Sequence, residues 1–177
     1  MKLYQEFLIG QDKDVVKEIN VAGAVILKVN DEHTNSVLLI KRSHHDHFPD
    51  IWEFPRGKQN QGEKDIRKTL KREIKEETGL DVEIIKYINK YEYIADQGKR
   101  KSTQFNFLCR MIDSKQKIKL SKEHQDYRWV SGMGMVELLV PPEMKKTIFQ
   151  VLNQDEQISE YQKTDEVIKE TQTRWRK

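Results

Sequence analysis

The sequence predicts an α+β domain, in which strands alternate with one central helix and helical segments follow near the C-terminal end. Three observations indicate this class. Several stretches between residues 19 and 130 are rich in β-branched and aromatic residues, which favour strands. Between these stretches, Ile66, Leu70 and Ile74 recur every four residues, the spacing of an amphipathic helix. A Pro-Pro pair then marks the start of a helix predicted at 142–152.

The N-terminal part of the chain predicts strands that precede the central helix. Residues 2–9 are a candidate short strand. Residues 19–29 and 36–42 are two β-branched runs separated by a polar turn, a pattern that predicts a hairpin. The small residues at 22–24 predict close approach by another element or a ligand. Further on, Trp52 and Phe54 fit the core or a pocket wall better than dedicated base-stacking residues.

The chain after the central helix predicts more strands and then helices. Gly79 is expected to end the helix. A long strand is predicted at 82–95, with a turn at 96–98. The remaining predicted elements are strands at 103–111, 115–120 (weak) and up to 130, followed by helical segments at 135–140 and 142–152.

Three carboxylates lie on one side of the central helix. Glu73, Glu76 and Glu77 are spaced i, i+3 and i+4, which places them beside the apolar stripe. One interpretation is a solvated charged face, in which Lys71 and Lys75 soften the repulsion. The other is a site for Mg²⁺, which prefers oxygen ligands and uses a few carboxylates together with substrate phosphates.

The stretch from Gly57 to Leu80 resembles the Nudix box, the loop–helix–loop signature of hydrolases that act on nucleoside diphosphates linked to another group. One spacing differs, because eight residues separate Glu63 from Arg72 where the family has seven. The extra residue weakens the expectation of an ion pair between these two side chains. The matching positions are Gly57, Glu63, Arg72, Glu73, Ile74, Glu76, Glu77, Gly79 and Leu80.

This resemblance, which covers about residues 19–152, implies a fold, a cofactor and a set of ligands. The fold is an αβα sandwich with a mixed sheet between helices, and the cofactor is Mg²⁺, with Mn²⁺ as an alternative. The implied metal ligands are the Gly57 carbonyl and the carboxylates of Glu73, Glu76, Glu77 and Glu123. Glu73, Glu77 and Glu123 are the implied catalytic residues, and the general base is Glu73 or Glu123.

The segment from Glu123 to Trp129 resembles that of asymmetric diadenosine tetraphosphate hydrolases, so a nucleoside polyphosphate is the expected substrate. The hairpin lysines could hold phosphates, or they could simply protect a sheet edge. A related group that acts on RNA 5′ ends shares the pre-box strand pattern, and a non-catalytic binding module stays open. The expected substrate-binding residues are Arg56, Lys58, Tyr93, Lys99, Lys101 and Tyr127.

Composition limits the remaining possibilities. The chain has 177 residues, a net charge of +3 and one cysteine, Cys109, which excludes an internal disulfide and fits the cytoplasm. No apolar run is long enough for a membrane span. We expect one domain at 1–152 and a polar, helical or partly disordered tail at 153–177. The histidines of 44–47 are either a solvated loop or a transition-metal cluster; the oligomeric state is open.

Overall fold

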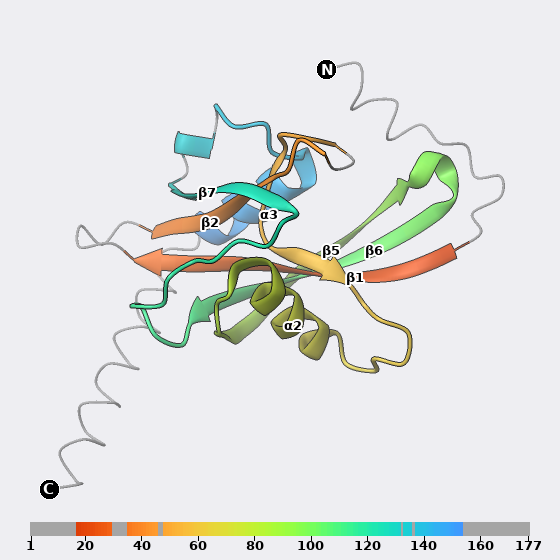
Figure 1. The fold of residues 1–177 in the computed structure, drawn as a ribbon, viewed down its shortest axis with the longest axis horizontal. Coiled ribbons are helices and arrows are strands. Elements are labelled where there is room, and N and C mark those ends of the chain that lie inside the picture. Colours follow the sequence, from red (N-terminus) through yellow and green to blue (C-terminus); the bar gives the residue numbers. More distant parts are fainter. Residues whose placement is uncertain (1–16, 30–34, 46–47, 132, 136, 154–177) are drawn as a thin grey trace, which may run out of the picture.

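A mixed β-sheet forms the centre of the molecule (Figure 1). The computed structural model describes residues 17–29, 35–45, 48–131, 133–135 and 137–153. The strands are β1 (Lys17–Val29), β2 (Asn35–Arg42), β3 (Trp52–Glu53), β4 (Arg56–Lys58), β5 (Val82–Ala95), β6 (Arg100–Met111) and β7 (His124–Val130). The helices are α2 (Ile66–Thr78) and α3 (Pro142–Leu152), and short 3₁₀ turns span Asp96–Gly98 and Met133–Met135.

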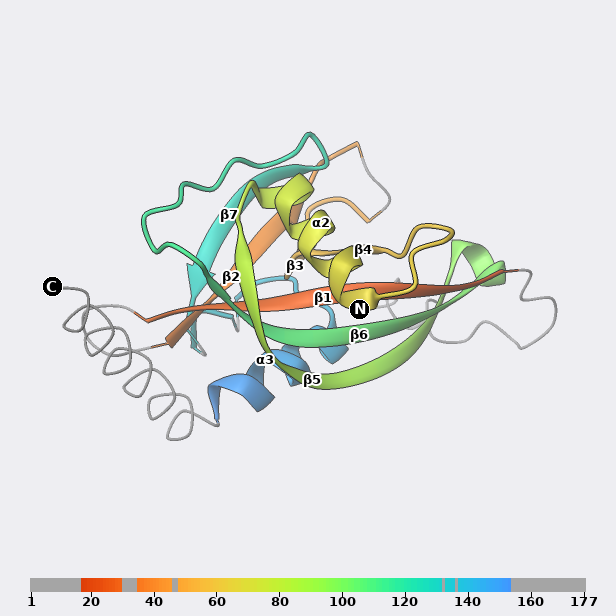
Figure 2. The same cartoon turned by 90° about the horizontal axis from the view of Figure 1, so that it is seen from below.

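The strand order is β3-β2-β1-β6-β5, with β4 also paired to β1 and β7 also paired to β2. The β1–β6 pair is parallel, and the other pairs are antiparallel. In Figure 2, α2 lies on one side of the central strands and α3 on the other. This arrangement confirms the predicted α+β sandwich with a mixed sheet.

Alternation along the strands divides the core into two layers. In β1, Ala24 and Ile26 face the layer under α2, whereas Val25 and Leu27 face the layer under α3, because successive side chains of a strand point to opposite faces. Both layers are closed to water. Leu70 and Ile74 from α2 and Met144 and Ile148 from α3 are at most 2% exposed.

Small residues and aromatics in this sheet have structural roles. A Cβ at Gly23 would collide with the ring of Phe54, which confirms the predicted close approach at 22–24. Trp52 and Phe54 are buried in the α3 layer, so they are core residues and not a base-stacking surface. Cys109 is buried on the other face, and burial raises the pKa of its thiol to about 12.

Most predicted elements are confirmed, and two are wrong. The hairpin at 19–29 and 36–42 is present as β1 and β2, and the strand at 82–95 is present with the same bounds. Residues 115–120 form no strand; instead Lys119 and Ser121 donate backbone hydrogen bonds to the last turn of α2. The predicted helix at 135–140 is replaced by a 3₁₀ turn and a non-helical approach to the proline pair, because residues before proline avoid helical geometry.

Three predictions concern residues outside the described part of the chain. These are the strand at 2–9, most of the tail at 153–177 and two of the four residues at 44–47. The division into a domain at 1–152 and a tail therefore stays a prediction. Neither α2 nor α3, nor any other helix in the described ranges, has the length and apolar character needed to cross a membrane.

Candidate active site

The three carboxylate side chains of helix α2 differ in their exposure to solvent. Asp65 caps its first turn by accepting a backbone hydrogen bond of 2.9 Å, and Gly79 ends it in the left-handed conformation. Between these caps the side chains of Glu77, Glu73 and Glu76 are 10%, 15% and 59% exposed. Glu77 therefore faces the sheet, Glu76 faces solvent and Glu73 lies between them.

Arg72 joins this helix to the preceding loop. Its guanidinium contacts both carboxylate oxygens of Glu63 at 3.1 Å and the carbonyl of Lys58 at 3.1 Å. Glu63 also accepts hydrogen bonds from the backbone of Asn60 and the hydroxyl of Thr69. The Glu63–Arg72 ion pair therefore forms in spite of the extra residue, and the inference against this pair from the longer spacing is wrong.

The same guanidinium holds two carboxylates of the helix. Arg72 donates to Glu73 at 2.8 Å and to Glu76 at 3.1 Å. Burial raises the pKa of Glu73, with further contributions from the charges of Glu76 and Glu123, and Arg72 opposes the rise. A Cβ at Gly57 would overlap the Glu73 carboxyl group, so only glycine permits this approach.

Glu77 lies at the junction of α2 and the sheet. Its Oε2 accepts a hydrogen bond of 3.0 Å from the backbone of Arg56, and its own carbonyl accepts one from Ser121. Burial is the main reason that its pKa is raised well above the usual range, and the nearby charge of Glu53 adds to the effect. A divalent cation at this carboxylate would supply the positive charge that favours ionisation.

A second buried carboxylate, which sequence reasoning missed, lies behind Glu77. Glu53 is 2% exposed and pairs with Arg42 and Arg56 at 2.8 Å each. Although burial opposes ionisation, Arg56, His124 and Arg42 hold the pKa of Glu53 well below its usual range. The only signal in the sequence was a charged residue between two apolar aromatics in a short strand.

His124 contacts this pair of carboxylates edge-on. Its Nε2 lies 3.8 Å from Glu53 Oε1 and 3.9 Å from Glu77 Oε1, and it is buried without a hydrogen-bond partner in the described part of the chain. Its Nδ1 lies 3.4 Å from the hydroxyl of Ser121. Both carboxylates thus lie within 4 Å of Nε2, and the Glu53 oxygens also accept hydrogen bonds from Arg42 and Arg56.

Glu123 occupies the exposed turn before β7. Its negative charge is among the causes that raise the pKa of Glu73. Its carbonyl accepts a hydrogen bond of 2.8 Å from Ser43, so the loop that contains the histidines lies against this turn. Within that loop, His44 pairs with Asp50 at 3.0 Å, which favours a surface ion pair over a metal cluster for this residue.

The expected substrate-binding residues separate into two groups. Arg56 donates a hydrogen bond of 2.6 Å to the hydroxyl of Tyr93, and its charge lowers the pKa of Lys58 after the effects of burial and of Arg100. Lys101 pairs with Glu92 at 3.0 Å, and Lys99 is exposed in the turn that follows β5. These side chains share one end of the sheet.

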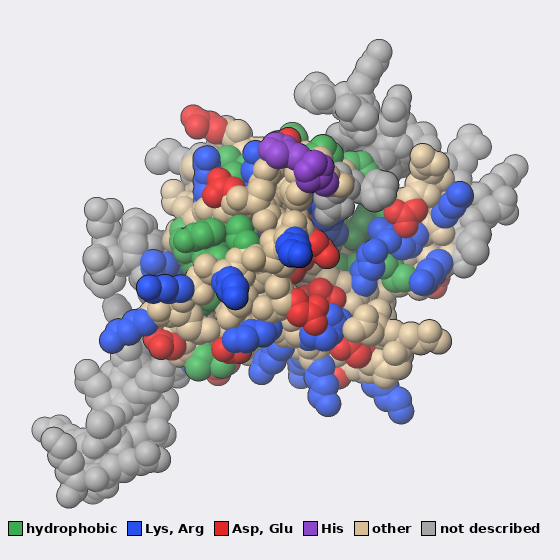
Figure 3. Space-filling model, in the orientation of Figure 1, with side chains coloured by type: hydrophobic (Ala, Val, Ile, Leu, Met, Phe, Trp, Pro, Cys, Tyr) green, Lys and Arg blue, Asp and Glu red, His purple; other side chains and the backbone are tan. Residues whose placement is uncertain are grey.

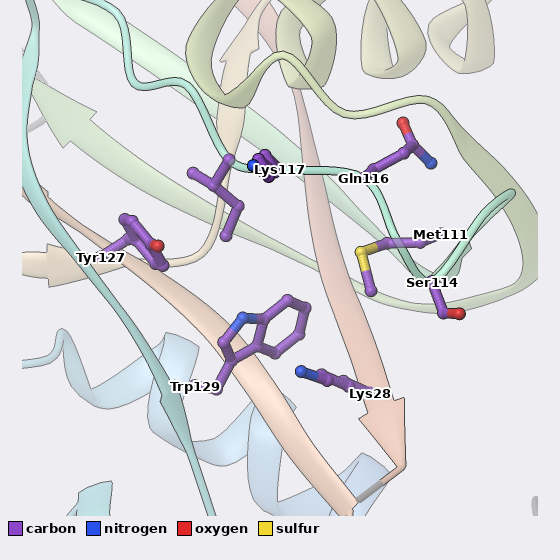
Figure 4. A pocket seen from close by; sticks show the side chains of 8 residues that line it. Lys28, Met111, Ser114, Gln116, Lys117, Tyr127 and Trp129 are labelled. Carbon is purple, nitrogen blue, oxygen red and sulfur yellow. The ribbon is translucent and has the colours of Figure 1, made fainter.

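Tyr127 is the one expected substrate-binding residue that lies away from this end of the sheet. It lies near Trp129 at the edge of a hollow beside the segment that connects β6 to β7 (Figure 4). The structure thus brings Arg56, Lys58 and Tyr93 together and leaves Tyr127 apart. The substrate-binding role of each of these residues stays a prediction.

The donor set fits a hard divalent cation. The carboxylates of α2 and the Gly57 carbonyl provide oxygen ligands, and the space at Gly57 that a Cβ would fill brings its backbone against Glu73. Within the described ranges, no three acidic, histidine or cysteine side chains are close enough together to hold a metal ion in their present conformations. Glu73 and Glu76 would therefore turn away from Arg72 to bind a cation.

Residues 20–151 match the NUDIX domain family. The chain belongs to this family. It is a Nudix hydrolase, an enzyme that acts on pyrophosphate bonds. The stretch from Gly57 to Leu80 is therefore the family's Nudix box, and its Glu63–Arg72 ion pair is retained with a longer connection.

Two similar proteins with curated names are asymmetrical bis(5′-nucleosyl)-tetraphosphatases. The asymmetrical bis(5′-nucleosyl)-tetraphosphatase of Mus musculus is 33% identical over 122 residues, which is 67% of this chain and 79% of the relative. The Rattus norvegicus protein of the same name is 32% identical with the same coverage.

Solved structures support the fold. A C. elegans Ap4A hydrolase binary complex has a TM-score of 0.65 and 22% identity, covering 75% of this chain and 94% of that one. A MutT protein from Methanosarcina mazei has a TM-score of 0.63 and 23% identity, covering 79% and 96%.

Proposed function

We propose that this Nudix hydrolase cleaves a phosphoanhydride bond in a dinucleoside tetraphosphate, with Mg²⁺ as the preferred ion and Mn²⁺ as a substitute. The observation that supports the chemistry most directly is the position of β4 against two carboxylates of α2, with Gly57 next to Glu73 and the Arg56 backbone bonded to Glu77. The named relatives support the substrate. We expect the reaction to take place in the cytoplasm.

The carboxylates of Glu73, Glu76 and Glu77, together with the Gly57 carbonyl and Glu123, would hold the metal ion. When bound, the ion neutralises charge on the phosphate oxygens and lowers the pKa of water. Glu73 or Glu123 would accept the proton of the attacking water, because a carboxylate beside that water can act as general base. Glu77→Gln should remove most activity, and comparison of Glu73→Gln with Glu123→Gln should identify the base.

The substrate would extend from these carboxylates toward the cationic end of the sheet. Lys58, Lys99 and Lys101 are suited to the phosphate chain, because ammonium groups pair with phosphate oxygens. Arg56 would position Tyr93, whose ring is the candidate for stacking on adenine, through the 2.6 Å hydrogen bond between them. Tyr127 would contact a more distant part of the substrate.

The decisive experiment is metal-dependent hydrolysis of a substrate panel: diadenosine tetraphosphate, 5′-triphosphorylated RNA, capped RNA, oxidised dGTP and ADP-ribose. The proposal predicts AMP and ATP from the first compound, with activity lost in Glu77→Gln. Glu83→Gln, which removes an exposed carboxylate on β5, is the matched control and should retain activity. Titration with Mg²⁺ and Mn²⁺ establishes the preferred ion.

Other outcomes of the same panel would replace this proposal. Release of pyrophosphate or cap from RNA, with poor turnover of the dinucleotide, would assign the enzyme to RNA 5′ ends. Inactivity on every compound, with folded protein and metal present, would indicate a substrate outside the panel or a binding role in spite of the complete box.

A further inference from the structure

A hollow on the α2 side of the sheet is separate from the carboxylate cluster. It has a volume of about 420 Å³ and lies between β7, the end of β1 and the segment after β6 (Figure 4). This volume is within the range of small-ligand sites. We propose that the hollow binds a nucleoside phosphate unit, with its base against Tyr127 and Trp129 and its phosphate on Lys28 and Lys117.

The aromatic wall comes from alternate residues of β7. Tyr127 and Trp129 pair with Ile40 and Leu38 of β2, so both side chains project from the α2 face. Two residues along a strand correspond to about 7 Å, roughly twice the contact distance between carbon atoms. One planar ring can therefore enter beside these side chains. Tyr127 is 43% exposed, so its ring is accessible from solvent.

The charge of the lining selects an anion. Lys28 and Lys117 are among the lining residues, and none of these residues is Asp or Glu. The Lys28 ammonium lies 5.7 Å from the centroid of the Trp129 ring. The ammonium group can pair with a phosphate, and the neighbouring aromatic rings can stack on the base that carries it.

One wall of the hollow is already fixed before any ligand binds. The side chain of Gln116 accepts a hydrogen bond of 2.7 Å from the backbone of Asp81 and donates to the carbonyls of Asp81 and Asp113 at 3.0 and 3.2 Å. These bonds hold the segment after β6 against the connection between α2 and β5. A preformed wall lowers the entropic cost of binding.

The hollow is near the active site but does not overlap it. Trp129 is five residues from His124 along β7, a separation of about 17 Å. In Figure 3 a hydrophobic patch over β2 and β7 and an acidic cluster beside α2 face the same way, with lysine and arginine side chains between them. A ligand that extends from the carboxylates could thus place a further nucleoside in the hollow. The inference depends on the proposed function only for the class of ligand.

The test is binding of AMP and of a 5′-phosphorylated pentaadenylate, in EDTA so that metal-dependent hydrolysis does not occur. Tryptophan fluorescence and calorimetry report saturable binding. Lys28→Gln combined with Lys117→Gln should weaken binding at least tenfold. The matched control, Lys90→Gln with Lys146→Gln, removes the same charge away from the hollow and should bind as the parent does. Tyr127→Ala should weaken binding about fivefold or more, and Tyr127→Phe should not, because stacking on the ring is retained.

The results separate the possible sources of the ligand. Equal affinity for AMP and the oligonucleotide would indicate a single nucleotide or one half of a dinucleotide, whereas much tighter binding of the oligonucleotide would indicate an RNA chain. The inference is overturned if neither probe saturates, or if both lysine pairs have the same effect. Hydrolysis of the panel compounds is measured separately, so loss of the proposed function and loss of this site are distinguishable.

Discussion

At the scale of single residues, the active site depends on side chains and spaces behind the helix carboxylates. His124 and Glu53 lie under Glu77, and the missing side chain of Gly57 leaves room for Glu73. The Nε2 of His124 is buried, has no hydrogen-bond partner within the described residues, and lies within 4 Å of the carboxylates of both Glu53 and Glu77. We infer that it positions Glu77.

Replacement of His124 tests this positioning role. His124→Leu should raise the Mg²⁺ concentration needed for half-maximal activity and lower kcat, because Glu77 loses the imidazole that packs 3.9 Å from its carboxylate. His124→Gln restores a donor and should recover part of both. The measurement is Mn²⁺ binding followed by electron paramagnetic resonance, together with Mg²⁺-dependent rates. Unchanged metal affinity in the leucine variant would contradict the role.

Replacement of Gly57 tests the space that Glu73 occupies. In Gly57→Ala the new Cβ would displace the Glu73 carboxyl group, and displacement of a catalytic group by about 1 Å can cost about 10²-fold in rate. We expect a loss of this size in kcat with a normal circular dichroism spectrum. Gly134→Ala is the control, because a Cβ there meets only Val130 at 4.0 Å. Full activity in Gly57→Ala would show that Glu73 is not a ligand.

At the scale of elements, the loop before α2 is joined to the helix through Glu63 and Arg72. The hydrogen bonds from Arg72, from the Asn60 backbone and from Thr69 lower the pKa of Glu63 to about 2. Its ordinary value is about 4.3. The ion pair therefore contributes stability above the ordinary value, and this contribution is lost as the pH falls toward 2.

Glu63→Gln should lower the free energy of unfolding at pH 7, and the difference from the parent protein should shrink between about pH 5 and pH 2, the range set by the two pKa values. Denaturant unfolding across this range measures it. Asp113→Asn, at an exposed turn outside the loop, is the comparison variant. A difference that stays constant with pH would mean that the carboxylate charge of Glu63 does not stabilise the loop.

At the scale of the whole molecule, the sheet separates two core layers, and the candidate active site borders only the layer under α2. The α2 layer contains Leu70 and Ile74, from the same helix as Glu73, Glu76 and Glu77, whereas the α3 layer contains Met144 and Ile148. Both layers stabilise the fold. Only the first is continuous with the active site.

Two core substitutions should distinguish the layers. Ile74→Ala and Ile148→Ala should each lower the free energy of unfolding by about 2–5 kcal/mol. Below the unfolding transition, Ile148→Ala should retain the rate of the parent and Ile74→Ala should not, because Ile74 directly follows Glu73. Phe149→Ala, at a residue 38% exposed on α3, should change stability much less. Equal losses of activity in Ile74→Ala and Ile148→Ala would show that the two core layers do not differ in their effect on the active site.

Local sequence patterns were sufficient for most of the fold and for the position of the box. The four-residue repeat of Ile66, Leu70 and Ile74 determined the face of α2, and β-branched runs determined the strands, because these signals depend on spacing within one segment. The carboxylate set was predictable for the same reason. The segment at 115–120 was mispredicted, because its backbone hydrogen bonds go to α2 and not to a neighbouring strand.

The sequence by itself determined the Nudix box, the layer of carboxylates on α2 and the mixed order of helices and strands. Only the tertiary structure decided that Glu53, Arg42, Arg56 and His124 meet behind Glu77, and that Tyr127 lies in a hollow apart from Tyr93. Contacts between residues distant in the chain depend on strand register and burial. No local pattern encodes which charged groups will share one desolvated space.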